Sequence, residues 1–172
     1  MNQYTQEHTL SYYAASANPV PPRPALQGEV ETDVCIIGAG YTGLSTALFL
    51  LENGFKVSIV EAAKVGFGAS GRNGGQIVNS YSRDIDVIER TVGPKPAQLM
   101  GQMAFEGGRI IRERIAKYNI QCDLKDGGVF AALSTKQIGH LESQKKLWER
   151  FGHTQLELMD AKRIREVVGT DS

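Results

Sequence analysis

The sequence has few of the features that mark secreted, metal-binding or membrane proteins. It contains only two cysteines among 172 residues, Cys35 and Cys122, and neither belongs to a CxxC or a Cys/His ligand pattern. We therefore expect neither a disulfide framework nor a metal site. It also has no apolar run of the ~20 residues that a membrane-spanning helix needs, so we expect no membrane partner.

An excess of charge of one sign is also missing. Nineteen basic and nineteen acidic residues cancel, which argues against a nucleic-acid partner. The opening residues, MNQYTQEHTL, lack the basic start and apolar stretch of a secretory signal, so we expect a cytoplasmic protein. The three histidines, His8, His140 and His153, have no catalytic spacing, and we expect them to be structural or exposed.

The glycines are where the sequence becomes informative. Residues 33–61 follow the pattern of a strand, a glycine turn, a helix and a second strand. Gly38 lets the chain turn tightly, Gly40 lets the backbone approach a pyrophosphate, and Gly43 lets the helix pack closely on the sheet. The helix N-terminus offers unpaired N–H groups to the phosphates. The turn therefore predicts dinucleotide binding through Gly38, Gly40, Tyr41, Thr42 and Gly43.

The second strand ends on a carboxylate. Glu61 follows Gly43 by 61 − 43 = 18 residues, where it can accept hydrogen bonds from an adenosine ribose. The same charge would repel a 2′-phosphate, so we expect the site to reject NADP-type ligands. Glu61 and the adjacent Ala62 are therefore the predicted contacts at this strand end.

The segments around the turn have a matching local pattern. Residues 34–37 form an apolar strand of the kind that is buried on both faces of a parallel sheet, and Cys35 within it is expected to be a buried thiol. Asn53-Gly54 is a helix stop signal, and residues 56–60 form the second strand.

A second glycine-rich segment, GFGASGRNGGQ, runs from Gly66 to Gln76. It has too much glycine for a helix interior and is too long for a simple turn, and it suits a backbone that lies along a ligand. An NAD-dependent dehydrogenase would instead continue with further strand–helix repeats. The segment therefore favours a flavin cofactor, and an NAD-dependent dehydrogenase stays an alternative.

The GAGYTG turn, the glutamate that ends the second strand and the GFGASGRNGGQ segment together resemble the D-amino-acid-oxidase superfamily of FAD-dependent amine oxidoreductases. The stretches SYYAAS, VNSYSRDIDVIER, FEGGRIIRERI and LWERFGHTQLELMDA narrow the resemblance to the flavoenzymes of bacterial putrescine catabolism. The resemblance implies FAD as the cofactor, a small-molecule amine as the substrate and oxygen as the electron acceptor. It implies that hydride is lost from a carbon bearing nitrogen, and that the resulting imine hydrolyses.

The resemblance also assigns contacts to the second glycine segment. We expect Gly75 and Gln76 to lie nearest the isoalloxazine ring, whereas the partner of Arg72 stays open between the diphosphate, the flavin and a protein carboxylate. The full set of flavin-side contacts implied by the resemblance is Ala69, Ser70, Arg72, Asn73, Gly74, Gly75 and Gln76.

The fold class implied by the resemblance is α/β: an FAD-binding Rossmann-type βαβ fold, incomplete, with the beginning of an α+β substrate domain. We expect an extended lead-in at 1–32, the N-terminal part of the FAD-binding domain at 33–120 and the start of the substrate domain at 121–172. Enzymes of this class are more than twice as long. We therefore expect an N-terminal fragment, inactive by itself and with its catalytic residues unassigned; a non-enzymatic remnant that associates through open sheet edges is the other alternative.

Two predictions concern the first half of the chain and the middle helix. In the lead-in, the proline-rich residues 18–24 favour extended chain, and Tyr12 and Tyr13 are candidates to anchor it. Residues 97–118 form an amphipathic helix whose three glycines require close packing. Its expected buried residues are Leu99, Met103, Ile110, Ile111 and Ile115.

Three predictions concern the last third of the chain. Residues 122–133 suggest a hairpin or sharp bend around Asp126-Gly127-Gly128. Ser134 is expected to cap a helix through Phe151, and Asp160 to cap a last helix at 161–168. The inward side of the first of these helices is expected to carry Ile138, Leu141 and Trp148.

Overall fold

The computed structural model describes residues 7–21 and 23–169, so residues 1–6, Pro22 of the proline-rich stretch and residues 170–172 lie outside the described part. The chain divides into two compact units, one ending at Gln76 and the other beginning at Ile77. The domain limits expected at residues 32 and 120 stay predictions. No helix of the described residues is long and apolar enough to cross a membrane.

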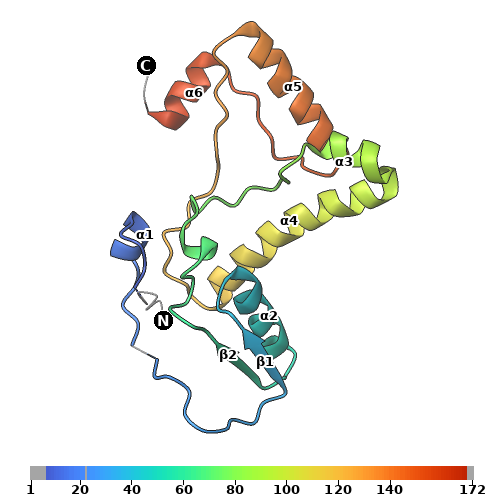
Figure 1. Ribbon diagram of the computed structural model, residues 1–172. Helices are drawn as coiled ribbons and strands as arrows, with labels where there is room; N and C mark the ends of the chain where they lie inside the picture. The colour runs from blue at the N-terminus through green and yellow to red at the C-terminus, as the bar shows by residue number, and fades with distance from the viewer. Residues whose placement is uncertain (1–6, 22, 170–172) are drawn as a thin grey trace. The chain divides into compact units, whose positions relative to one another are not determined.

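The first unit is built around two parallel strands joined by a helix (Figure 1). Strand β1 (Val34–Ile37) pairs with β2 (Val57–Val60), and α2 (Tyr41–Glu52) makes the crossover that parallel neighbours require. The register places Val34 beside Val57 and Ile37 beside Val60. The helix ends at Asn53, and the following Gly54 has φ +85°, which confirms the predicted stop.

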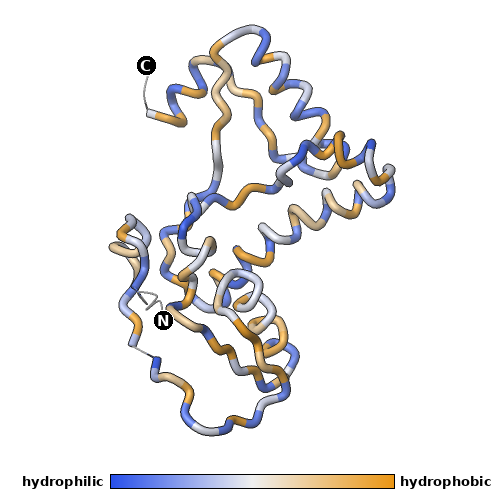
Figure 2. Tube along the Cα trace, viewed as in Figure 1, coloured by the Kyte–Doolittle hydropathy of each residue, from blue (hydrophilic) through white to orange (hydrophobic). Residues whose placement is uncertain are grey.

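The strands of this small sheet are buried on one face only. Ile37 is 89% exposed and Cys35 is exposed as well, whereas Val34 and Ile36 are half-buried. Alternate residues of a strand point to opposite faces, and α2 packs on one of them. Both strands are strongly apolar, as Figure 2 shows. The expectations of a strand buried on both faces and of a buried thiol at Cys35 were therefore wrong.

The lead-in is not extended throughout. Residues Tyr12–Ala15 form a short helix, α1, whose first turn is capped by the Ser11 hydroxyl, which accepts a hydrogen bond from Ala14 N–H at 3.2 Å. Of the two candidate anchors, Tyr13 is the one that ties the lead-in to a distant segment: its hydroxyl donates to the Gly74 carbonyl at 2.9 Å. Tyr12 is 77% exposed.

The second unit contains four helices among its described residues. They are α3 (Ile85–Val92), α4 (Pro94–Lys117), α5 (Thr135–Arg150) and α6 (Ala161–Val168). Sequence reasoning missed α3, which is separated from α4 by Gly93 at φ +87°. The buried hydrophobic core of this unit consists of Ile85, Ala97 and Phe151, and the partly buried Tyr81, Ile88, Leu147 and Trp148 pack against it.

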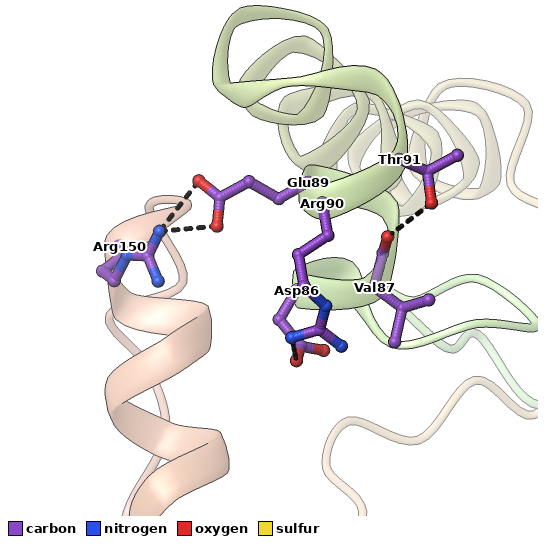
Figure 3. Close-up of polar contacts among 6 residues, drawn as sticks. All are labelled: Asp86, Val87, Glu89, Arg90, Thr91 and Arg150. Atoms are coloured by element: carbon purple, nitrogen blue, oxygen red, sulfur yellow. Dashed lines mark hydrogen bonds and ion pairs between the residues drawn. The ribbon is translucent and has the colours of Figure 1, made fainter.

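An ion pair joins α3 to α5 beside this core. Figure 3 shows the Arg150 guanidinium donating to both carboxylate oxygens of Glu89, at 2.9 and 2.8 Å. Along α3, Arg90 also pairs with Asp86 one turn earlier, at 2.8 Å. Because these groups lie near water, each pair contributes at most about 1 kcal/mol to the free energy of unfolding.

The buried side of α4 differs from the expected one. Leu99 and Met103 are each 58% exposed and Ile111 is 44% exposed, while Ile110 and Ile115 are half-buried. The buried residues of α4 are Ala97, Gly101 and Gly108. Helical periodicity predicted that the large apolar residues would be buried. The packing partners instead approach the helix where its side chains are smallest.

Glycine explains this close approach. A Cβ at Gly101 would lie 2.8 Å from Cδ1 and 3.0 Å from Cβ of Phe151, and one at Gly108 would lie 2.7 Å from Oδ1 of Asn79. The predicted need for close packing is therefore confirmed at these two positions. It was wrong at Gly107, where nothing lies within 4 Å.

The segment between α4 and α5 forms no hairpin. Residues 122–133 contain no strand, and Phe130 and Leu133 are 83% and 90% exposed. Gly127 has φ +97°, but the chain forms neither a turn nor a bend at residues 126–128. The described residues supply no neighbouring strand to pair with this segment.

The two C-terminal helices begin where their caps were predicted. Ser134 Oγ accepts from Gln137 N–H at 3.4 Å at the start of α5, and Asp160 Oδ1 accepts from Arg163 N–H at 2.7 Å at the start of α6. Ile138, however, is 49% exposed, so its predicted inward position was wrong.

We expect Gly101→Ala to destabilise the second unit by about 1–2 kcal/mol. The added methyl group would overlap the buried Phe151 ring, and this overpacking exceeds the gain in helix propensity. The matched control is Gly107→Ala in the same helix, which should stabilise by about 1 kcal/mol because its Cβ meets open space. Urea unfolding followed by Trp148 fluorescence measures both. Equal effects of the two substitutions would contradict the prediction.

Candidate dinucleotide-binding site

The glycine turn after β1 has the geometry that its sequence predicts. Gly38 has φ +100°, a conformation that side chains rarely adopt, and its N–H donates to the Val60 carbonyl of β2 at 2.8 Å. A Cβ at Gly43 would lie 2.0 Å from the Gly38 carbonyl oxygen and 3.3 Å from the Ile36 side chain. The helix therefore starts closer to the strand than any residue other than glycine permits.

Glu61, the first residue after β2, holds this turn through its carboxylate. Its Oε2 accepts from the Ala39 N–H at 2.8 Å, and its Oε1 accepts from the Ala63 N–H at 3.0 Å. These two hydrogen bonds lower the pKa of Glu61 below its ordinary value, the bond from Ala39 being the larger cause. The side chain therefore stays charged at the edge of the turn, and its contact with a ribose stays a prediction.

Ser70 brings the second glycine segment onto the first. Its hydroxyl accepts from the Tyr41 N–H at 3.0 Å, at the N-terminus of α2. Gly40 leaves room for this contact, because a Cβ there would lie 3.0 Å from Ser70 Oγ. Sequence reasoning placed both segments in one site but gave no signal for this particular contact.

The second segment is an ordered turn. A 3₁₀ turn spans Ala69–Gly71, and a Cβ at Gly71 would lie 2.3 Å from the Gly66 carbonyl oxygen. The amide of Asn73 ties the turn together: its Oδ1 accepts from Gly75 N–H at 2.8 Å. Its Nδ2 lies within hydrogen-bond distance of the Tyr41 hydroxyl (2.8 Å) and of the carbonyls of Ser70 (2.9 Å) and Ala69 (3.2 Å).

Many of the predicted cofactor contacts are exposed at the surface of the first unit. The Arg72 guanidinium lies 5.1 Å from the centre of the Phe67 ring, in a cation–π contact. This ring was not among the three expected partners of Arg72, which were the diphosphate, the flavin and a protein carboxylate. The predicted contacts that are exposed to solvent are Tyr41, Thr42, Glu61, Ala62, Ala69, Arg72, Asn73, Gly74, Gly75 and Gln76.

These features fit a dinucleotide. The first N–H groups of α2 have no partners within the helix, although that of Tyr41 donates to Ser70, and the glycines of the turn add no side chains beside them. The charged Glu61 lies at the end of β2, on the same edge of the sheet as the turn. All of these groups belong to the first compact unit.

The comparison with protein families decides which dinucleotide is involved. The DAO family, described as FAD dependent oxidoreductase, matches residues 33–171. The chain belongs to this family of FAD-dependent oxidoreductases. The match begins one residue before β1 and includes both glycine segments. It therefore supports FAD over the NAD-dependent alternative.

Several proteins are similar to this chain. Gamma-glutamylputrescine oxidoreductase of Escherichia coli K12 is 59% identical over 96% of this chain and 39% of its own length. A probable oxidoreductase, OrdL, of Haemophilus influenzae is 42% identical over 99% of this chain and 40% of its own length. D-amino acid dehydrogenase 2 of Pseudomonas aeruginosa is 51% identical, over 40% of this chain and 15% of its own length.

The first of these relatives confirms the predicted resemblance to γ-glutamylputrescine oxidoreductase. The chain spans about two fifths of the length of the first two relatives. No solved structure matches this chain.

Proposed function

We propose that this chain forms part of the FAD-binding region of an amine oxidoreductase that acts on γ-glutamylputrescine. The observation that carries the proposal is the 59% identity to the E. coli γ-glutamylputrescine oxidoreductase across 96% of the chain. The two interlocked glycine segments support it. When bound, FAD supplies the oxidation of the amine carbon; hydrolysis of the imine then gives aldehyde and ammonia, and oxygen is reduced to hydrogen peroxide.

The residues of the first unit divide between the two halves of the cofactor. The 38–43 turn and the N-terminus of α2 receive the pyrophosphate, and Glu61, with the adjacent Ala62, binds the adenosine ribose. This arrangement corresponds to a Rossmann-type βαβ fold. The flavin-side contacts are Ala69, Ser70, Arg72, Asn73, Gly74, Gly75 and Gln76. The proposed domain limits are 33–120 for the FAD-binding part and 121–172 for the start of the substrate domain.

Titration of FAD with the purified chain tests the cofactor assignment. We expect saturable quenching of flavin fluorescence and no saturable change with NADH. If NADH bound instead and Glu61→Ala abolished that binding, the chain would be a dehydrogenase. If neither nucleotide bound and ultracentrifugation showed concentration-dependent oligomers, the chain would be a non-enzymatic remnant.

The substrate needs a separate test. This chain can replace the corresponding N-terminal part of the E. coli relative, and the resulting flavoprotein can be mixed anaerobically with candidate substrates. We expect γ-glutamylputrescine to bleach the visible flavin bands faster than free putrescine or a D-amino acid. Faster bleaching by either of the other two compounds would overturn the proposed substrate.

A further inference from the structure

We infer that the lead-in segment at 7–15 is a strap that positions the flavin half of the site, with Tyr13 as the positioning residue. The inference rests on the proposed FAD site. Neither Tyr13 nor any other residue of the lead-in was among the predicted cofactor contacts. The only sequence signal was the tyrosine pair in SYYAAS, and it pointed to an anchor without naming its partner.

The contact between Tyr13 and the second glycine segment is specific. The Tyr13 hydroxyl donates to the Gly74 carbonyl at 2.9 Å, across 61 residues of sequence. The tyrosine also packs against the next residue: a Cβ at Gly75 would lie 2.7 Å from the hydroxyl oxygen and 3.3 Å from Cζ. Gly75 has φ +68°, so both its backbone conformation and its space require glycine.

The same turn is held from its other side. Asn73 Oδ1 accepts from Gly75 N–H, and Asn73 Nδ2 donates to the hydroxyl of Tyr41 at the start of α2. The 73–75 turn is therefore fixed between Tyr13 of the lead-in and Tyr41 of the dinucleotide turn. Loss of the Tyr13 hydroxyl removes the hydrogen bond from the lead-in, while Asn73 keeps its bonds to Tyr41, Ala69 and Ser70.

Further contacts keep the strap in place. Glu7 forms an ion pair with Lys64, which lies between β2 and the second glycine segment. The rings of His8 and Phe67 lie 6.4 Å apart, centre to centre. Because both contacts are at the surface, they are weak. The hydrogen bond of Tyr13 is the one that reaches the glycines expected beside the flavin.

This geometry separates the two halves of the cofactor. Tyr13 donates to Gly74 and packs against Gly75, whereas the ADP half is proposed to bind at the 38–43 turn, α2 and Glu61, so the ADP half should bind without Tyr13. The peptide at 74–75 depends on Tyr13 for its position, and it is the part expected beside the isoalloxazine ring. Removing the Tyr13 hydroxyl should therefore weaken the binding of FAD but not the binding of ADP.

Tyr13→Phe tests the inference, with Tyr12→Phe as its matched control. The control removes the same atom from the adjacent, 77% exposed tyrosine. Hydrogen exchange of the free chain is the first readout: Tyr13→Phe should raise exchange at residues 71–76 and leave α2 unchanged. Titrations with FAD and with ADP are the second: we expect about 3- to 10-fold weaker FAD binding, with ADP unchanged.

Three results would overturn the proposed strap. One is unchanged exchange at 71–76 in Tyr13→Phe, and another is equal behaviour of the two tyrosine variants. The third is a parallel loss of FAD and ADP affinity, which would show a general structural role. Failure of the unsubstituted chain to bind FAD would instead contradict the proposed function, and the exchange readout would still decide whether Tyr13 fixes the turn.

Discussion

Gly43→Ala is expected to unfold the strand–helix–strand unit and abolish FAD binding. The new methyl group would lie 2.0 Å from the Gly38 carbonyl oxygen, well inside any real contact distance. That oxygen belongs to backbone in a constrained turn, so it cannot move aside without breaking the hydrogen bond from Gly38 N–H to Val60. Overpacking against backbone costs about 3 kcal/mol or more, a large share of a domain's stability.

Hydrogen exchange resolved by peptide measures this effect, because it reports the two compact units separately. Peptides from α2 and β2 should lose their protection in Gly43→Ala, while those from α4 keep it. Gly68→Ala is the control for stability, since nothing lies within 4 Å of its Cβ and its φ is −79°. It should stay within about 0.5 kcal/mol of the parent. Normal protection of α2 in Gly43→Ala would contradict the packing described here.

Glu61→Gln is expected to weaken FAD binding by about 10-fold and to loosen the glycine turn. The carboxylate accepts from two backbone N–H groups, at Ala39 and Ala63, with both of its oxygens. A glutamine keeps one acceptor oxygen and turns an NH₂ group toward the other N–H. It also loses the charge that strengthens these bonds. Because the site is exposed, we expect an effect at the lower end of the range that is usual for hydrogen bonds to charged groups.

The lowered pKa of Glu61 adds a pH dependence with a definite sign. A depressed pKa in the folded state means that the stabilisation is present above the ordinary value of 4.5 and is lost as the pH falls through the folded-state pKa. The first unit should therefore lose stability on acidification below 4.5, and Glu61→Gln should reduce that loss.

Chemical unfolding at neutral and acidic pH, together with FAD titration, checks both effects. Glu29→Gln in the exposed lead-in makes the same charge change away from the turn and should leave affinity and pH profile unchanged. An identical acid profile for Glu61→Gln and the parent chain would show that the carboxylate does not hold the turn.

Local chemistry made much of this fold predictable. Gly38 and Gly43 fixed the turn, Asn53-Gly54 ended its helix, and Asp160 capped another, because each of these signals acts within a few residues. For the same reason, the position of Glu61 at the end of β2 followed from spacing alone.

Local sequence signals did not predict the contacts between segments that are distant in the sequence. Periodicity placed Leu99 and Met103 inside, but the neighbouring segments approach α4 at Gly101 and Gly108. An apolar strand pattern likewise does not say how many of its faces are covered, and Ile37 proved exposed.

The sequence by itself determined the glycine turn, the position of Glu61 after the second strand and the family, because glycine spacing and strand ends are local and chemically restrictive. Only the tertiary structure placed Ser70 on the N-terminus of α2 and Tyr13 on Gly74. These contacts span 29 and 61 residues, and they depend on how the chain returns to the turn in three dimensions. No side-chain pattern along the sequence encodes that return.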